Sequence, residues 1–369
     1  MTRGARPDTV TPMRAAPTAV TIGTFDGVHT GHHALVESAR RSVGEAGRVV
    51  VLAFEPHPAT RLGTRRPPPR LTTWRCRVRE LRRAGADEVR ALAPGSGLLE
   101  LSAEAFIDHV VTSFAPAALV EGEDFRFGSG RGGDLTTLAG LGAARGFELI
   151  TVPDVGVTLA DGSVRRASST LARDLLARAR VRDLRALLGR PYAIEGEVVR
   201  GDRRGRAVGV PTANIAHETA LPADGVYAAR AHLPDGRSLA AAINVGARPT
   251  VDGVQRRAEA HLLGLPTSCD APAAAAPGDP EDRWSAVGGL SEYGWRIEVE
   301  LLGWIRDQVR FRSLDALVDQ LRRDCARAAR LADTGTVADR PVFSPPSGRD
   351  ATPRIHTRSG RASTAGAPK

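Results

Sequence analysis

The segment TIGTFDGVHTGHH, residues 21–33, joins a short apolar run to an amphipathic helical pattern. The run 19–22 is typical of a buried strand, and glycines at 23, 27 and 31 allow a tight turn in which the backbone approaches a ligand closely. Apolar residues at helical spacing then predict a helix over 32–46. The loop therefore lies between the carboxyl end of a strand and a helix N-terminus, where unpaired N–H groups and the helix dipole favour a bound anion.

Three other interpretations apply to this loop. Its glycines do not fit G-x-G-x-x-G, which excludes a dinucleotide fingerprint. His29, His32 and His33 are close enough in sequence to suggest zinc, but no CxxC or HExxH completes a coordination shell. A plain glycine-rich turn with solvated histidines would explain the loop if it stood alone, so the remaining motifs decide between that interpretation and a nucleotide site.

Arginine carries almost all of the positive charge. The chain has 369 residues and a net charge of +9, and its only lysine is Lys369. A Walker A loop, a protein-kinase strand lysine and a Schiff-base lysine are therefore excluded. The arginines are scattered through the chain up to the tail rather than gathered in one stripe, which disfavours nucleic-acid binding.

The length of the chain indicates two domains with additional segments. Cys76, Cys269 and Cys325 are odd in number and far apart, which indicates no disulfide framework and fits a reducing compartment. There is no run of 18 apolar residues, and residues 1–17 lack the apolar core of a signal peptide. We expect a soluble cytoplasmic protein with a disordered arm over residues 1–17.

Between about residues 18 and 180, apolar runs alternate with helical patterns, as in a parallel sheet covered by helices. The expected strands are 19–23, 48–54, 88–92, 117–121 and 147–152. The expected helices are 32–46, 73–84, 102–113 and 134–145. Because ligands of such sheets bind beyond the carboxyl ends of the strands, the segments that follow the strands are the ones to inspect for chemistry.

Three such segments carry polar or aromatic groups. FEPHP, residues 54–58, has prolines that stiffen a loop. EGEDFRFGSGRGGD, residues 121–134, combines glycines with acidic and aromatic groups that could hold a nucleotide or a stacked ring. In RRASSTLAR, residues 165–173, a serine caps a helix while Arg166 and Arg173 could reach a triphosphate. Taken alone, the first is a rigid turn and the third an N-cap with surface arginines.

After LGRPY, residues 188–192, short strands follow one another without helices between them, which predicts a small antiparallel barrel or sandwich. A helix beginning at Ser313 should pack on it through an apolar stripe. Residues 265–290 form an inserted low-complexity loop, and residues 334–369 form a basic tail that we expect to be disordered. The expected strands are 192–200, 225–233, 239–244, 257–263 and 295–302, and the stripe is Leu314, Leu317, Val318, Leu321 and Cys325.

Two stretches of this second half carry chemistry. GDRRGRAVGVPTAN, residues 201–214, has a glycine–arginine loop that could fold over phosphates. Pro211 then fixes the backbone so that Thr212 and Asn214 present oxygen ligands on one side of an extended segment, and oxygen ligands suit Mg²⁺. The alternative is a polar strand end after a loop. Glu259 could point to water or into a pocket, and alone it would be a surface residue.

The order of GTFDGVHTGH, FEPHP, GEDFRFG, SSTLAR and GRAVGVPTAN resembles the family of bacterial bifunctional riboflavin kinase/FMN adenylyltransferases, also called FAD synthetases, from about residue 18 to 331. The resemblance implies an α/β fold class. Residues 18–183 would form a Rossmann-like nucleotidyltransferase domain with a parallel sheet. Residues 184–333 would form an antiparallel β-barrel riboflavin kinase domain with a terminal helix. The implied activities are phosphorylation of riboflavin to FMN and adenylylation of FMN to FAD, with ATP and Mg²⁺.

The resemblance also implies site residues. ATP would be bound for adenylyl transfer by Gly23, Phe25, Asp26, His29, His32, Asp124, Arg166, Ser169, Thr170 and Arg173. ATP would be bound for the kinase reaction by Gly205, Arg206, Gly209, Pro211, Thr212 and Asn214. The flavin would contact Phe54, Pro56, His57, Phe125, Asn244 and Arg248. The implied catalytic residues are His29, His32, Arg173 and Glu259, the last as general base on the ribityl 5′-hydroxyl, and the metal ligands are Thr212 and Asn214.

Two alternatives stay open. Gly264 stands where the family usually carries an acidic residue, and an Ala/Pro/Gly-rich segment follows it. These departures would fit a paralogue with one of the two activities, or one that acts on a flavin analogue. The other alternative is a non-catalytic flavin- or RNA-binding regulator, which the charged residues retained at both sites disfavour. The expected partners are small-molecule substrates and no membrane, and the sequence leaves open whether the chain forms a homo-oligomer.

Overall fold

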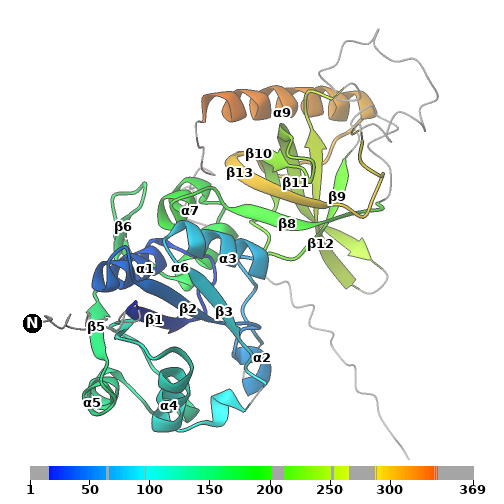
Figure 1. Cartoon of the computed structure of the whole chain (residues 1–369). Coiled ribbons are helices and arrows are strands. Elements are labelled where there is room, and N and C mark those ends of the chain that lie inside the picture. The colour runs from blue at the N-terminus through cyan, green and yellow to red at the C-terminus, as the bar shows by residue number, and fades with distance from the viewer. Residues whose placement is uncertain are drawn as a thin grey trace, which may run out of the picture.

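The computed structural model describes residues 16–63, 66–95, 97–201, 212–250, 253–265, 287, 289–335, 337 and 339. An N-terminal parallel sheet carries helices on both faces, and a closed antiparallel barrel follows it with a long helix across the outside (Figure 1). The predicted α/β fold class is confirmed, and the second half is a barrel rather than a sandwich.

The parallel sheet has the strand order β3-β2-β1-β4-β5, and every neighbouring pair in it is parallel. Its strands are β1 (Thr18–Gly23), β2 (Arg48–Phe54), β3 (Glu88–Leu92), β4 (Ala118–Gly122) and β5 (Glu148–Val152). The sequence placed each of these strands within one residue of its observed bounds. Such agreement follows from their short apolar runs, which are bounded by turn residues.

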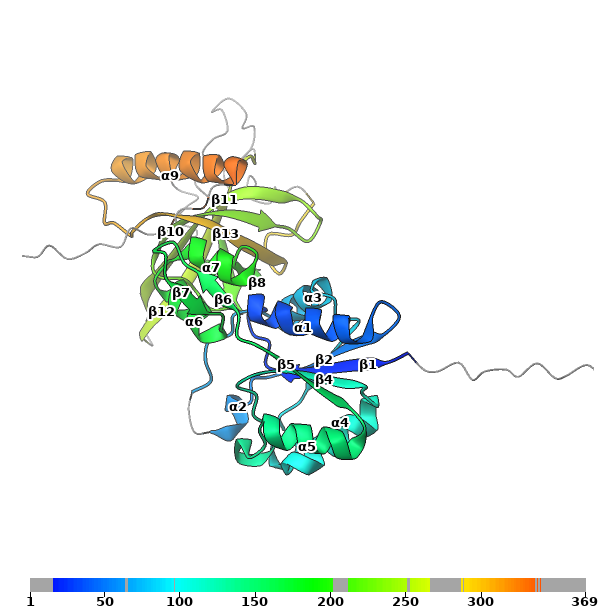
Figure 2. The ribbon, with the colours of Figure 1, turned by 90° about the vertical axis from the view of Figure 1, so that its left-hand side faces the viewer.

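Helices cover both faces of this sheet, as Figure 2 shows. Alternate residues of β2 face opposite sides: Val49 and Val51 pack in the core under the helix 30–43, whereas Val50 and Leu52 pack in the core under the helix 103–114. The helices are α1 (Thr30–Val43), α3 (Trp74–Arg83), α4 (Ala103–Phe114) and α5 (Leu135–Arg145), and the short helical turns are α2 (Ala59–Leu62), η1 (Leu98–Glu100) and η2 (Ser129–Arg131).

Strands β1 and β4 separate toward their carboxyl ends. They pair only at Ala19↔Ala118 and Val20↔Leu119. Beyond that point the N–H of Ile22 donates to the side-chain Oε1 of Glu121 at 2.8 Å instead of continuing the backbone ladder. The strand order reverses at this position, and such a switch point is where open α/β sheets bind ligands.

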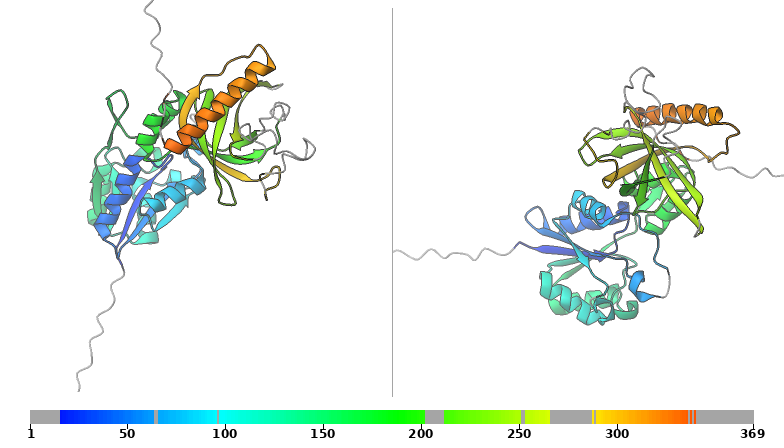
Figure 3. Two further views of the ribbon diagram at one scale, coloured as in Figure 1. Left: turned by 90° about the horizontal axis from the view of Figure 1, so that it is seen from above. Right: turned by 90° about the vertical axis from the view of Figure 1, so that its right-hand side faces the viewer.

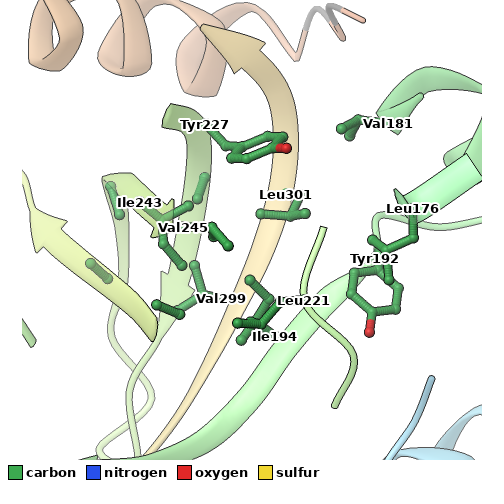
Figure 4. Packing of buried hydrophobic residues seen from close by; sticks show 14 of the residues in the cluster. Leu176, Val181, Tyr192, Ile194, Leu221, Tyr227, Ile243, Val245, Val299 and Leu301 are labelled. Atoms are coloured by element: carbon green, nitrogen blue, oxygen red, sulfur yellow. The ribbon is translucent and has the colours of Figure 1, made fainter. Parts of the chain in front are cut away.

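A connecting unit joins the sheet to the barrel. It consists of the hairpin β6 (Gly156–Thr158) and β7 (Val164–Arg166), then α6 (Ser169–Ala177) and α7 (Val181–Leu188). Leu176 and Val181 belong to the same buried cluster as Ile194 and Leu301 of the barrel wall (Figure 4). The domain boundary that the sequence placed after residue 183 therefore falls inside α7, a helix that was not expected.

The barrel has the strand order β10-β11-β12-β9-β8-β13, with all pairs antiparallel (Figure 3). Small and branched apolar side chains fill its interior around the fully buried Tyr227, whose hydroxyl donates to the carbonyl of Ala223 at 2.6 Å. The strand β9 was not predicted, and β11 and β13 run further than expected. The strands are β8 (Ala193–Val199), β9 (Ala213–His217), β10 (Gly225–His232), β11 (Ser238–Thr250), β12 (Gly253–Leu262) and β13 (Arg296–Arg306).

Helix α9 (Leu314–Thr334) lies across the outside of the barrel (Figures 1 and 3). As predicted, Ser313 caps it, because its hydroxyl accepts from the N–H of Ala316 at 3.2 Å. The predicted stripe is wrong at Leu314, whose side chain is 60% exposed, because the helix meets the barrel further along, through Cys325 and Ala328. The predicted arm 1–17, insertion 265–290 and tail 334–369 lie almost wholly outside the described residues.

The connecting unit offers a stability test. Leu184 of α7 is fully buried in the cluster shared with the barrel, so Leu184→Ala should lower the free energy of unfolding by about 2–5 kcal/mol. Leu314→Ala, on the exposed side of α9, should change it by less than about 0.5 kcal/mol. Urea denaturation of both variants measures the difference. Equal, small effects would show that α7 is not part of the barrel core.

Candidate functional site

A cavity of about 610 Å³ opens at the carboxyl end of the parallel sheet, where β1 and β4 separate. A volume of this size suits a small-molecule or cofactor site. It is lined by the loop after β1, the N-termini of α1 and α6, and the segment after β4. The structure thus brings together nine of the predicted site residues: Gly23, Phe25, His29, His32, Phe54, Asp124, Phe125, Arg166 and Ser169.

Two stacked imidazoles begin helix α1. His29 is the N-cap residue, and the rings of His29 and His32 lie with centroids 3.7 Å apart and planes 21° from parallel. The backbone N–H of His29 donates to Nδ1 of His32 at 3.3 Å. An Nδ1 that accepts a hydrogen bond places the proton of a neutral imidazole on Nε2, so His32 keeps an Nε2–H donor.

Burial keeps both imidazoles neutral near pH 7. It lowers the pKa of His29 to about 4, and the positive fields of His33 and Arg166 act in the same direction. Burial also lowers the pKa of His32 well below its ordinary value. Nδ1 of His29 is buried and has no hydrogen-bond partner among the described residues. The pair can therefore bind a phosphate oxygen by hydrogen bonding, without carrying charge of its own.

A second helix N-terminus faces the same cavity. Ser168 caps α6 by accepting from the N–H of Leu171 at 3.1 Å, and Ser168 and Ser169 line the cavity wall. Arg166, just before the cap, pairs with Asp124 at 2.6 Å and with Asp154 at 2.8 Å. Two helix N-termini thus point positive potential into one space, which favours a polyphosphate, while two carboxylates hold Arg166 at the edge of that space.

Asp26 and Arg173 hold the loop in place. The carboxylate of Asp26 accepts from the N–H groups of Leu71 and Thr72 at 3.0 Å and from Nη2 of Arg173 at 2.5 Å. The hydroxyl of Ser169 donates to the main-chain oxygen of Asp26 at 2.7 Å. Neither Asp26 nor Arg173 lines the large cavity, but Asp26 lines a smaller cavity next to it.

A smaller cavity of about 180 Å³ lies beside the large one. The predicted flavin contacts divide between the two: Phe54 lines both, Phe125 lines the large cavity, and Pro56 and His57 line the small one. Thr170, also predicted to bind ATP, is on the exposed side of α6 and lines neither.

Glu121 is the first residue of the acidic motif 121–134, but it was not among the predicted site residues. Its side chain is almost completely buried, lines the large cavity and bridges β1 and β4 through the N–H of Ile22. Burial raises the pKa of this carboxyl well above its usual range. The signal was present, because an acidic residue stands at the end of the apolar run of β4.

The barrel brings three predicted kinase residues together. Glu259 of β12 pairs in register with Asn214 of β9 on one side and with Asn244 of β11 on the other. Directly opposed residues share a face of the sheet, and the chain neighbours of these three are buried in the barrel core, so the three side chains face outward. Gln308 approaches the same place, where its Nε2 donates to Oδ1 of Asn244 at 3.0 Å.

The remaining predicted kinase residues are only partly visible. Thr212 immediately precedes β9, two positions before Asn214 in an extended segment. Arg248 lies in β11, and its side chain is not described. In the ranges that the structure describes, no group of three or more His, Cys, Asp or Glu is arranged to hold a metal ion. The positions predicted here that lie outside those ranges are Gly205, Arg206, Gly209 and Pro211.

Comparison with known proteins gives two family matches. The family model described as FAD synthetase matches residues 11–167, and the one described as riboflavin kinase matches residues 188–332. None of the helices in the described ranges combines the length and apolar character needed to traverse a bilayer.

Two curated relatives are bifunctional riboflavin kinase/FMN adenylyltransferases. The protein of Escherichia coli K12 is 36% identical over 312 residues, which cover 83% of this chain and 90% of the relative. The protein of Haemophilus influenzae is 31% identical, with 84% and 92% covered. A solved structure from Streptococcus pneumoniae, described as a macrolide-efflux protein, superposes with a TM-score of 0.69 at 29% identity and covers 87% of this chain and 96% of its own.

The lowered pKa of His29 makes stability depend on pH in a defined direction. As pH falls from about 6.5 to about 4, the unfolded chain binds a proton at this position and the folded chain does not, so folding loses stability. In His29→Gln this loss disappears, and the fall in unfolding free energy between pH 7.5 and 5 should be smaller by about 2 kcal/mol. Urea denaturation at pH 7.5 and pH 5 measures the unfolding free energy of the variant and of the wild type. An equal fall in both proteins would contradict this prediction.

Proposed function

The chain belongs to the family of bifunctional riboflavin kinase/FMN adenylyltransferases, and on that premise we propose that it makes FAD in two ATP-dependent steps. The barrel, within residues 184–333, phosphorylates riboflavin to FMN. The sheet domain, within residues 18–183, transfers an adenylyl group from a second ATP to FMN and releases pyrophosphate. The observation that most supports the proposal is the cavity into which stacked neutral imidazoles and two helix N-termini point.

This cavity suits adenylyl transfer without a covalent intermediate. An oxygen of the FMN phosphate attacks the α-phosphorus of ATP, and the bond to the pyrophosphate oxygen breaks. The protein need only align two anions and stabilise the charge that develops. In the proposed arrangement Nε2–H of His32 and the N-termini of α1 and α6 donate to phosphate oxygens, and Arg166 exchanges a carboxylate partner for a phosphate.

The proposed flavin position follows from the aromatic residues. Phe54 and Phe125 line the cavity beside the phosphate-binding end, so the isoalloxazine ring would pack against them. Pro56 and His57 would border its far edge from the small cavity. Asp26, which also lines the small cavity, and Arg173 fix the loop, and for that reason we assign them positioning roles.

On the barrel we propose that Glu259 accepts the proton of the riboflavin 5′-hydroxyl as that oxygen attacks the γ-phosphorus of ATP. Thr212 and Asn214 offer neutral oxygen ligands next to Glu259, a donor set that fits Mg²⁺. Bound there, the ion would offset the charge of the ATP phosphates. Asn244 and Arg248 are the proposed flavin contacts.

The location of the protein in the cytoplasm stays a prediction from the sequence.

The kinase assignment predicts a selective loss. Glu259→Gln removes the proton acceptor and should lower FMN formation from riboflavin and ATP by about 100-fold or more, whereas FAD formation from supplied FMN persists. Chromatographic separation of riboflavin, FMN and FAD measures both reactions. Glu197→Gln, an exposed residue on β8, is the matched control and should leave both unchanged. If the Glu259 variant still makes FMN at the wild-type rate, the assignment is wrong.

The transferase assignment predicts the converse. His32→Ala removes the Nε2–H donor and should lower FAD formation from FMN and ATP by about 100-fold or more, while FMN formation from riboflavin continues. The same chromatographic assay applies, with His109→Gln on the exposed side of α4 as control. Unchanged FAD formation in the His32 variant would show that the cavity is not the site of adenylyl transfer.

A further inference from the structure

Arg190 lies between α7 and β8 and reaches back to the loop of the transferase cavity. Its Nη2 donates to the carbonyl of Gly27 at 2.8 Å and its Nη1 to the carbonyl of Val28 at 3.0 Å. Both carbonyls immediately precede the N-cap His29. A side chain from the segment that leads into the barrel thus holds the backbone at the position where helix α1 begins.

That backbone is strained. Phe25, Gly27 and Val28 have positive φ angles of 49°, 89° and 44°. A glycine adopts such angles freely, but a β-branched valine does so only at a cost and only where its surroundings hold it. The two charge-assisted hydrogen bonds from Arg190 act on this point, because they fix the carbonyls on both sides of the Val28 α-carbon.

One peptide group connects Arg190 to His32. The carbonyl of Val28 accepts from Arg190, and the N–H of the same peptide group, on His29, donates to Nδ1 of His32. A cation at the carbonyl polarises the peptide and strengthens its N–H as a donor. The arginine therefore favours the form of His32 that accepts at Nδ1 and carries its proton on Nε2.

We propose that Arg190 is a positioning residue for adenylyl transfer, which fixes the orientation and tautomer of His32 through the Val28–His29 peptide group. The inference rests on the proposed function of the cavity. It gives the LGRPY segment a role at the transferase site, although its place in the chain is at the start of the barrel.

The barrel anchors this arginine through a chain of ion pairs. Nε of Arg190 lies 3.6 Å from Glu80, whose carboxylate is 4% exposed and also pairs with Arg79 at 2.8 Å. Arg79 in turn donates to both carboxylate oxygens of Glu298 on β13, at 2.6 and 2.7 Å. The position of Arg190, and with it the loop of the transferase cavity, therefore depends on contact with the barrel wall.

The charges around the imidazoles decide how the reaction should depend on pH. The groups that act on His29 and His32 are His33 on α1, Asp26, Arg77, Arg166 and Arg190 itself. Arg190 is one of those that lower both pKa values. Its removal should raise them, so the acidic limb of the rate profile for FAD formation should move to higher pH.

The test uses the full chain with FMN, ATP and Mg²⁺. Arg190→Met should lower kcat for FAD formation by about 10–100-fold, the equivalent of losing charge-assisted hydrogen bonds at the loop, and shift the acidic limb to higher pH. Arg190→Lys keeps the charge and one donor, so it should recover part of kcat and the wild-type acidic limb. FMN formation should stay unchanged in both. Arg83→Met is the matched control, because Arg83 pairs with the same Glu80 at 2.9 Å from an exposed position.

A readout without turnover separates this inference from the proposed function. Imidazole ¹⁵N chemical shifts of His32 in the ligand-free protein at pH 7.5 should show the Nε2–H form in wild type and a tautomer mixture in Arg190→Met. If the wild-type protein makes no FAD, the proposed function is refuted. The tautomer of His32 would still decide the role of Arg190. Unchanged tautomer, or equal losses of FMN and FAD formation with no recovery in Arg190→Lys, would overturn the inference.

Discussion

The buried carboxylate of Asp26 is the constraint on which the transferase cavity depends. This carboxylate, which is 5% exposed, accepts from two backbone N–H groups and from the guanidinium of Arg173. Breaking such a buried pair typically costs about 3–5 kcal/mol, because the remaining charge has no compensation. A stabilisation of this order can hold Phe25 and Val28 in left-handed conformations, and those conformations present His29 and His32 to the cavity.

Sequence patterns located the sheet domain well and the connection to the barrel poorly. Short apolar runs bounded by turn residues define parallel strands almost uniquely, so β1 to β5 were predicted closely. Helix α7 was missed because it has only eight residues, although Val181, Leu184 and Leu188 recur at helical spacing and are buried against the barrel. The strand β9 was missed because residues 201–214 were interpreted as a glycine–arginine loop that leads into a short extended segment, so no strand was assigned to residues 213–217.

In the candidate sites, the sequence indicated which residue types could do chemistry but not which way their side chains face. The family resemblance predicted roles for the imidazoles and for the barrel residues Asn214 and Glu259, and strand register places Asn214 opposite Glu259. The resemblance did not separate residues that face the cavity from residues that fasten its loop. Arg173 and Asp26 are 147 positions apart, and only the folded chain shows that they bind each other. Glu121 escaped notice because a strand position usually signals packing, whereas here it bridges two separating strands.

Polar contacts fix how the two halves of the chain sit against each other. Thr73 at the start of α3 donates to the buried carboxylate of Glu195 on β8 at 2.7 Å, and Arg79 forks onto Glu298 of β13. Sliding the barrel along α3 would break these contacts and leave the buried carboxylate of Glu195 without Thr73, which is costly, whereas a purely apolar contact could shift at little cost. Because α3 also begins beside the Leu71–Thr72 segment that binds Asp26, the barrel and the loop of the cavity are held by one continuous set of contacts.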